Sequence, residues 1–180
     1  MVRTFIAIDL TPEVRERMSG PQGVLAGCRA RLTLVKPASI HITLKFLGEI
    51  DEKTLGRVRE ALSAICFEPF EIALGGMKGN PPSFPRVIWS GVRDEVACGR
   101  IFALVEEALF PLGIPKERRA YTPHATLARV KRFDPSLLPT LKELASEEFG
   151  SCPVRCIKLK KSTLTPSGPV YEAIMEVRCA

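Results

Sequence analysis

The 180-residue chain has little histidine, few aromatic side chains and no long apolar run. Histidine occurs twice, tryptophan once and tyrosine twice, and aromatic residues make up 7% of the chain. The six cysteines include no C-x-x-C pair and no histidine at zinc-ligand spacing, so we expect most of them to be buried apolar side chains, with a Cys152–Cys156 disulfide left open. No apolar stretch approaches the roughly 18 residues of a membrane-spanning helix.

The sequence also lacks the motifs of ATP-driven and metal-dependent chemistry. It contains no G-x-x-x-x-G-K-[ST] phosphate-binding loop, which argues against kinase activity and ATP-driven ligation. Neither histidine has a carboxylate or a cysteine two to four residues away, so a metal ion would lack ligands there. We therefore expect neither a metal nor a cofactor.

Basic residues outnumber acidic ones, 26 to 20, which gives a formal net charge of +6. This balance suits an anionic partner such as nucleic acid. The first ten residues, Met1–Leu10, resemble a strand interrupted by Asp9 rather than an export signal. The sequence thus predicts a cytoplasmic protein without membrane association.

Apolar spacing and turn residues predict strands and helices in two similar halves. We expect strands over residues 3–9, 31–35, 40–47, 70–74, 86–92, 124–130, 155–161 and 171–178. We expect helices beginning at 11–13 and over 51–65, 101–109 and 135–147, with a glycine- and proline-rich loop over 75–85. The fold class is therefore α+β, and residues 1–180 are expected to form a single two-lobed domain around a central cleft.

Both histidines lie in the same tetrapeptide pattern. His41–Leu44 and His124–Leu127 both read H-x-T-L, 83 residues apart. Packing alone gives no reason for the same hydroxyl residue to follow both histidines. Because imidazole titrates near neutrality, two of them can act together as a general acid and a general base. The pattern therefore predicts a catalytic histidine pair.

Strand alternation predicts which side chains accompany each histidine. In the first copy, His41, Thr43 and Lys45 should share one face, with Phe46 pointing into the core. We expect the Thr43 hydroxyl to bind a phosphate oxygen, and Lys45 to add positive charge beside it.

In the second copy, His124 and Thr126 should share one face, and Thr126 should act as Thr43 does. Simple alternation points Arg129 away from His124 unless the strand bulges. The two copies together would surround a small anion with two imidazoles and two hydroxyls.

The extended motifs carry a resemblance to a known family. His41–Gly48 and Pro123–Arg129 resemble the two signature motifs of the two-histidine phosphoesterases. Within that superfamily the chain is most similar to the LigT family of RNA 2′,3′-cyclic phosphodiesterases, and the opening stretch 3–9 and the strand around Trp89 fit this likeness. The resemblance implies a bilobal fold with pseudo-twofold duplicated antiparallel sheets, helices on the outside and a central cleft.

The resemblance also implies an activity and roles for residues. The activity is metal-free opening of an RNA-terminal 2′,3′-cyclic phosphate to a 2′-phosphomonoester, with 2′-5′ ligation as its reversal. His41 is the implied proton donor to the leaving O3′, and His124 the implied proton acceptor that activates water. Arg129 matches the family pattern and is expected to contact the phosphate or ribose.

Other residues are candidates for RNA contacts. Arg118 and Arg119 precede the second motif and are expected to follow the RNA backbone. Phe84 or Tyr121 is a candidate for stacking on the terminal base. The expected partner is RNA with a 2′,3′-cyclic phosphate end, tRNA fragments included, bound by a monomer.

Two alternatives remain open from the sequence. One is the same chemistry on a small cyclic nucleotide or an ADP-ribose cyclic phosphate. The other is an RNA-binding module without enzymatic activity, which the intact H-x-T-L pair argues against.

Overall fold

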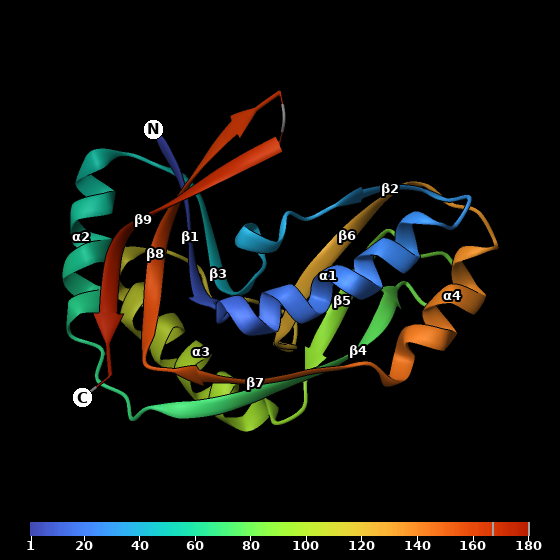
Figure 1. Ribbon diagram of the computed structural model, residues 1–180. Coiled ribbons are helices and arrows are strands. Elements are labelled where there is room, and N and C mark those ends of the chain that lie inside the picture. The colour runs from blue at the N-terminus through green and yellow to red at the C-terminus, as the bar shows by residue number, and fades with distance from the viewer. Residues whose placement is uncertain (167, 180) are drawn as a thin grey trace.

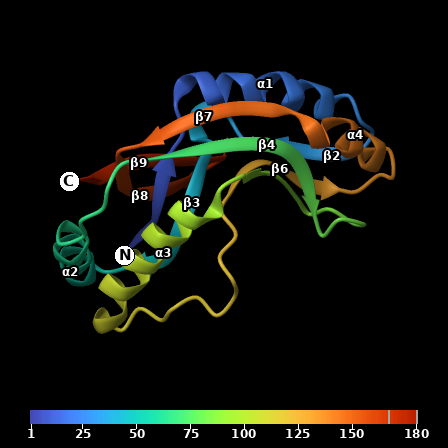
Figure 2. The ribbon, with the colours of Figure 1, turned by 90° about the horizontal axis from the view of Figure 1, so that it is seen from below.

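The protein is a curled antiparallel sheet with helices packed on its outside (Figures 1 and 2). The computed structural model describes residues 1–166 and 168–179, which contain nine strands and four α-helices. The strands are β1 (Val2–Asp9), β2 (Arg31–Leu34), β3 (His41–Ile50), β4 (Phe70–Asn80), β5 (Val87–Val92), β6 (His124–Arg132), β7 (Glu148–Val154), β8 (Cys156–Thr165) and β9 (Gly168–Arg178). The helices are α1 (Pro12–Ala26), α2 (Glu52–Ser63), α3 (Glu95–Leu109) and α4 (Leu137–Glu143).

The order of the strands is symmetric about the middle of the sheet. Along the sheet the order is β7-β4-β5-β6-β3-β1-β8-β9, with β2 pairing separately with β6. The two motif strands, β3 and β6, meet at the centre. Within the described residues they share one register pair, Ile42 with Ala125, and these are the second residues of the two H-x-T-L motifs. The sheet therefore consists of two lobes joined where the motifs lie.

Each lobe is covered by helices from both halves of the chain. Helices α2 and α3 cover the lobe of β3, β1, β8 and β9, whereas α1 and α4 cover the lobe of β6, β5, β4 and β7. In Figure 2 α1 runs along the top of the molecule and α3 along the bottom. Thus α1, from the N-terminal half, packs behind the second motif, and α3, from the C-terminal half, packs behind the first. The expected α+β fold with outer helices is confirmed.

The expected starts of the first two helices are also confirmed, because the capping residues act as expected. The Thr11 hydroxyl accepts a hydrogen bond from the Val14 amide, and Pro12 occupies the first turn of α1. The Asp51 carboxylate accepts from the Thr54 amide at 2.7 Å and caps α2. None of the helices in the described part of the chain is long and apolar enough to cross a membrane.

The expected loop over 75–85 is wrong in its first part. Strand β4 continues to Asn80, because its glycine-rich stretch pairs with β5 as far as Asn80, whereas the pairing with β7 on the other side ends at Gly75. Gly76 adopts a φ of +68°, and a Cβ at Gly79 would lie 2.5 Å from the Pro85 ring, so both positions require glycine. Strand β7, with Gly150 and Pro153, was not expected, since these residues are rare inside strands.

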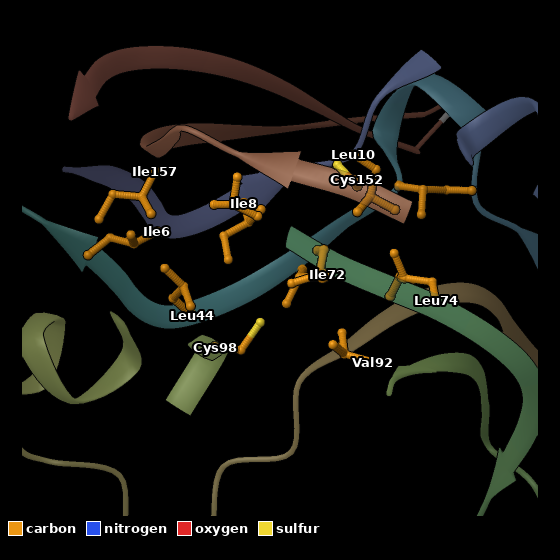
Figure 3. Close-up of a cluster of buried hydrophobic side chains, with 14 of the residues drawn as sticks. Ile6, Ile8, Leu10, Leu44, Ile72, Leu74, Val92, Cys98, Cys152 and Ile157 are labelled. Carbon is orange, nitrogen blue, oxygen red and sulfur yellow. The ribbon is translucent and has the colours of Figure 1, made fainter. Parts of the chain in front are cut away.

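Apolar side chains from both lobes pack into one core (Figure 3). Ile8 of β1, Ile72 of β4 and Ile157 of β8 are essentially inaccessible to solvent. Two of the six cysteines, Cys98 and Cys152, belong to this cluster, whereas the other four are half-buried or exposed, and all six are free thiols. The expectation that most cysteines are buried therefore holds for two of them.

One buried polar side chain links α1 to the second motif. The Gln22 amide nitrogen donates to the carbonyl oxygens of Val35 and Leu127, at 2.8 Å each. The Leu127 oxygen also accepts from the Val35 amide at 2.9 Å. Since Gln22 is only 4% exposed, these carbonyls have little access to water as an alternative donor.

We therefore expect Gln22→Leu to destabilise the protein by about 1–3 kcal/mol, because it leaves buried carbonyl groups with fewer donors. Urea denaturation would measure the loss. Glu16→Leu, on an exposed position of the same helix, is the matched control and should change stability much less. Equal effects of the two substitutions would contradict the anchoring role of Gln22.

Candidate active site

The two motifs place four polar side chains on one face of the sheet. Ile42 and Ala125 are paired and fully buried against the helix-covered side. Alternation turns His41 and Thr43, and likewise their counterparts in β6, to the opposite side. Extending the antiparallel register by one residue in each direction sets each histidine beside the threonine of the other motif. We call this side the motif face; it carries His41, Thr43, Phe46, His124, Thr126 and Arg129.

Both imidazoles are oriented in the same way. His41 Nδ1 lies 2.7 Å from the carbonyl oxygen of Ser39, and His124 Nδ1 lies 2.7 Å from that of Thr122. A carbonyl oxygen can only accept, so Nδ1 carries the hydrogen in each ring. In the neutral form this leaves Nε2 as a free proton acceptor, and in the charged form Nε2 is a donor. Each ring can therefore exchange a proton through Nε2.

A β-bulge interrupts the alternation of the first motif strand. Thr43 and Lys45 pair with consecutive residues of β1, so Leu44 is an extra residue in β3. Leu44 and Lys45 are both buried on the helix side, and Phe46 turns to the motif face, where it is 71% exposed. The expectations that Lys45 shares the face of His41 and that Phe46 points into the core are therefore both wrong.

The second motif strand contains the same feature. Thr126 and Ala128 pair with consecutive residues of β5, so Leu127 is the extra residue. Leu127 and Ala128 are both buried, whereas Arg129 is exposed on the side of His124. The strand therefore does bulge, which was the condition for Arg129 to lie on the side of His124, and Arg129 is on the motif face.

Lys45 instead forms a buried ion pair with Glu106 of α3. The Lys45 ammonium also donates to the carbonyl oxygen of Pro115 at 2.8 Å. The second carboxylate oxygen of Glu106 accepts from the backbone amide of Glu117 at 2.7 Å. This pair thus fixes the segment that leads from α3 to the second histidine.

The surroundings of the two histidines differ. The His41 ring forms a three-ring cluster with Phe5 and Tyr171, whose centroids are 4.9 and 5.2 Å from it and 5.0 Å from each other. Burial lowers the pKa of His41 to about 4, although the Ser39 carbonyl acts in the opposite direction. His124 is exposed and meets the ring of Trp89 at a centroid distance of 5.0 Å.

A group of charges lies beside His41, at the end of β1. The Asp9 carboxylate forms ion pairs with Lys160, with Lys158 at 3.2 Å and with Arg15 at 3.3 Å. Burial raises the pKa of Asp9, but the hydrogen bonds and charges of Lys160 and Lys158 outweigh it and hold the pKa below its usual value. Lys158 also pairs with Glu176 at 3.8 Å, so three cations lie beside two carboxylates, and the remaining positive charge at this end of the motif face suits an anion.

The remaining sequence candidates have different outcomes. The Tyr121 ring stacks on Phe102, with centroids 4.2 Å apart, and its hydroxyl donates to the Thr43 carbonyl oxygen at 3.3 Å. Tyr121 therefore supports β3 and is not available for stacking. The Phe84 ring packs against Phe133, with centroids 4.4 Å apart.

The aromatic residue that sequence reasoning missed is Phe46, because only the bulge turns it to the motif face. Within residues 1–166 and 168–179, no group of three or more His, Cys, Asp or Glu side chains is arranged to hold a metal ion.

Comparison with known proteins agrees with this arrangement. The family model described as LigT like Phosphoesterase matches residues 8–89 and 93–171. The chain belongs to this family. The match includes both histidine motifs and the strands that hold them.

Named relatives are similar to this chain over most of its length. A protein from Archaeoglobus fulgidus named RNA 2′,3′-cyclic phosphodiesterase is 38% identical over 172 residues, 95% of this chain and 97% of the relative. One of the same name from Aeropyrum pernix is 41% identical over 150 residues, 81% of this chain and 85% of the relative.

Two solved structures show the same fold. A protein from Thermus thermophilus is 30% identical and has a TM-score of 0.82, covering 98% of this chain and 97% of that one. E. coli LigT complexed with 3′-AMP is 21% identical, with a TM-score of 0.81 and coverage of 99% and 98%. These similarities extend over both lobes.

The buried ion pair generates a stability prediction. Lys45→Met should destabilise the protein by about 3–5 kcal/mol, because it leaves the Glu106 carboxylate buried and unpaired. Combining Lys45→Met with Glu106→Leu should restore most of the lost stability. Lys53→Met, at an exposed position of α2, is the control. Denaturation midpoints would measure all three; a double variant as unstable as the single one would count against the pair.

The environment of His41 generates a pH prediction. Its pKa of about 4 in the folded protein lies below the ordinary value of 6.5, so the unfolded chain binds more protons between these pH values. Stability should therefore fall by up to about 3 kcal/mol as the pH decreases through this window. His41→Gln should remove this contribution. Denaturation of the wild type and of His41→Gln at pH 7 and 4.5 would test this prediction. An identical change in stability with pH in the two proteins would refute it.

Proposed function

We propose that this chain is an RNA 2′,3′-cyclic phosphodiesterase that opens the terminal cyclic phosphate to a 2′-phosphomonoester. The observation that carries the proposal is the pair of imidazoles, each held through Nδ1 with Nε2 free, beside two threonines on one face. Relatives 37–41% identical to this chain bear that activity as their name. The electropositive motif face suits the anionic substrate.

The reaction needs one base and one acid. Water attacks phosphorus, and the P–O3′ bond breaks on the opposite side, so one group removes a proton from water and another protonates O3′. In our proposal His124 is the base, since the residue is exposed and its Nδ1, not its Nε2, contacts the Thr122 carbonyl. His41 is the acid. The threonine hydroxyls and the Arg129 guanidinium donate to the non-bridging oxygens, where charge concentrates in the transition state.

The low pKa of His41 places a condition on its role as the acid. At neutral pH the ring is uncharged in the free protein. A phosphate anion close to Nε2 favours the charged imidazole and raises its pKa. His41 therefore takes up its proton when the substrate binds, and the site becomes active only with the anion in place. No step of this sequence requires a metal ion.

Phe46 completes the proposed site by binding the terminal base. It is the most exposed aromatic side chain on the motif face, and its ring lies 6.1 Å from that of Phe5, which in turn contacts His41. A base stacked on this ring would have its ribose close to His41. Stacking of this kind tolerates all four bases, so it favours RNA ends of any sequence.

The test uses a short RNA that ends in a 2′,3′-cyclic phosphate, incubated with the protein in EDTA. We expect conversion to the 2′-phosphate, and a loss of about 10²–10⁴-fold in rate for His41→Ala and for His124→Ala. Arg129→Ala should also be strongly impaired, whereas Arg132→Ala, exposed at the end of the same strand, is the control.

Product analysis separates the possible outcomes of this experiment. A 3′-phosphate product would contradict the proposed direction of ring opening. Wild-type rates in either histidine variant would sink the acid–base mechanism. Joining of the product to a 5′-hydroxyl RNA would show that the reverse 2′-5′ ligation also occurs.

A further inference from the structure

A hollow of about 480 Å³ adjoins the motif face beside Phe46. One side is formed by residues 45–47 of β3, and the other by residues 114–119, which belong to the segment between α3 and β6. Figure 2 shows this segment as a long loop below the sheet. Since β3 pairs with β6 only at Ile42 in the described chain, the edge of β3 beyond that point is free to face the loop. The volume is within the range of small-ligand sites.

The wall formed by the loop is positively charged. Lys116, Arg118 and Arg119 are all exposed. The carboxylate on this wall is that of Glu117, and it accepts hydrogen bonds from the backbone amides of Arg118 and Arg119, at 3.0 and 3.4 Å. Glu117 thus holds the turn that presents both guanidinium groups. The Lys116 ammonium lies over the Phe110 ring, 5.5 Å from its centroid, so Arg118 and Arg119 are the cations that remain for a ligand, and with one carboxylate they leave a net positive wall.

The buried ion pair described above holds this wall in place. Lys45 binds the carbonyl oxygen of Pro115, and Glu106 binds the amide of Glu117, so the backbone is anchored on both sides of Lys116. A backbone that is already ordered loses little entropy when its side chains bind a ligand. The wall of the hollow is therefore already in place before a ligand binds.

We propose that this hollow binds the nucleotide that precedes the terminal cyclic nucleotide of the RNA, with its linking phosphodiester against Arg118 and Arg119. The inference rests on the proposed function and deepens it. If Phe46 stacks on the terminal base and the histidines hold the cyclic phosphate, the remaining bond of that nucleotide leads from O5′ to the next phosphate. The cation-lined hollow borders Phe46, where that phosphate emerges. A cyclic mononucleotide has no such phosphate and gains nothing from the hollow.

The experiment compares two substrates, a 2′,3′-cyclic mononucleotide (N>p) and the dinucleotide that carries one more nucleotide on its 5′ side (NpN>p). In the wild type we expect kcat/KM for NpN>p to exceed that for N>p, mainly through a lower KM. Arg118→Ala combined with Arg119→Ala should reduce this preference by about 10- to 100-fold, the usual effect of lost hydrogen bonds to a charged group. Turnover of N>p should not change.

A control variant with the same loss of charge isolates the effect of position. Lys53→Ala combined with Arg57→Ala removes two exposed cations from α2, away from the hollow, and should keep the preference for NpN>p. The salt dependence gives a second readout. The slope of log kcat/KM against log salt should be steeper for NpN>p by about 0.7, the value for one neutralised phosphate of a single strand.

The two proposals fail in different ways. If the wild type hydrolyses N>p and NpN>p equally well, the proposed function holds and the subsite is overturned. The subsite is also overturned if both double variants lose the preference to the same extent. If neither substrate is opened, the phosphodiesterase assignment fails, and the inference that rests on it fails with it.

Discussion

The arrangement of the site depends on one extra residue in each motif strand. Leu44 and Leu127 interrupt the alternation, so that the fifth residue after each histidine turns back to the face of that histidine. In the first copy this residue is Phe46, and in the second it is Arg129. In the proposed function, the same backbone feature therefore supplies an aromatic ring for a base on one side and a cation for a phosphate on the other. A symmetric scaffold acquires an orientation for its substrate in this way.

The helices that support the two motifs come from opposite halves of the chain. Gln22 of α1 hydrogen-bonds to the strand of the second motif, and Glu106 of α3 pairs with Lys45 on the strand of the first. In each case the polar side chain is buried, so its bond to the strand is shielded from competing water. This shielding fixes the histidine strands relative to the helices, as the proposed acid–base pair would require.

Sequence reasoning identified the α+β fold, the helix caps and the histidine motifs, because each has a local signal. Capping residues precede α1 and α2, and the repeated H-x-T-L is visible without any structure. The positions of Lys45 and Phe46 were wrong because a period of two assumes that every residue has its own partner on the neighbouring strand. A bulge gives one strand a residue without a partner, and it can be recognised only when the two strands are aligned with each other. Strand β7 was missed because its glycine and proline are tolerated only at the edge of a sheet.

The exchange of helices between the lobes has a consequence for the integrity of the chain. A cut between β4 and β5 would divide the sequence into two segments, each with one H-x-T-L motif. Neither segment would contain the helix that backs its own motif strand, since α3 covers β3 and α1 packs behind β6. The two segments would therefore have to associate before either motif strand had its supporting helix, as the subunits of a domain-swapped dimer do.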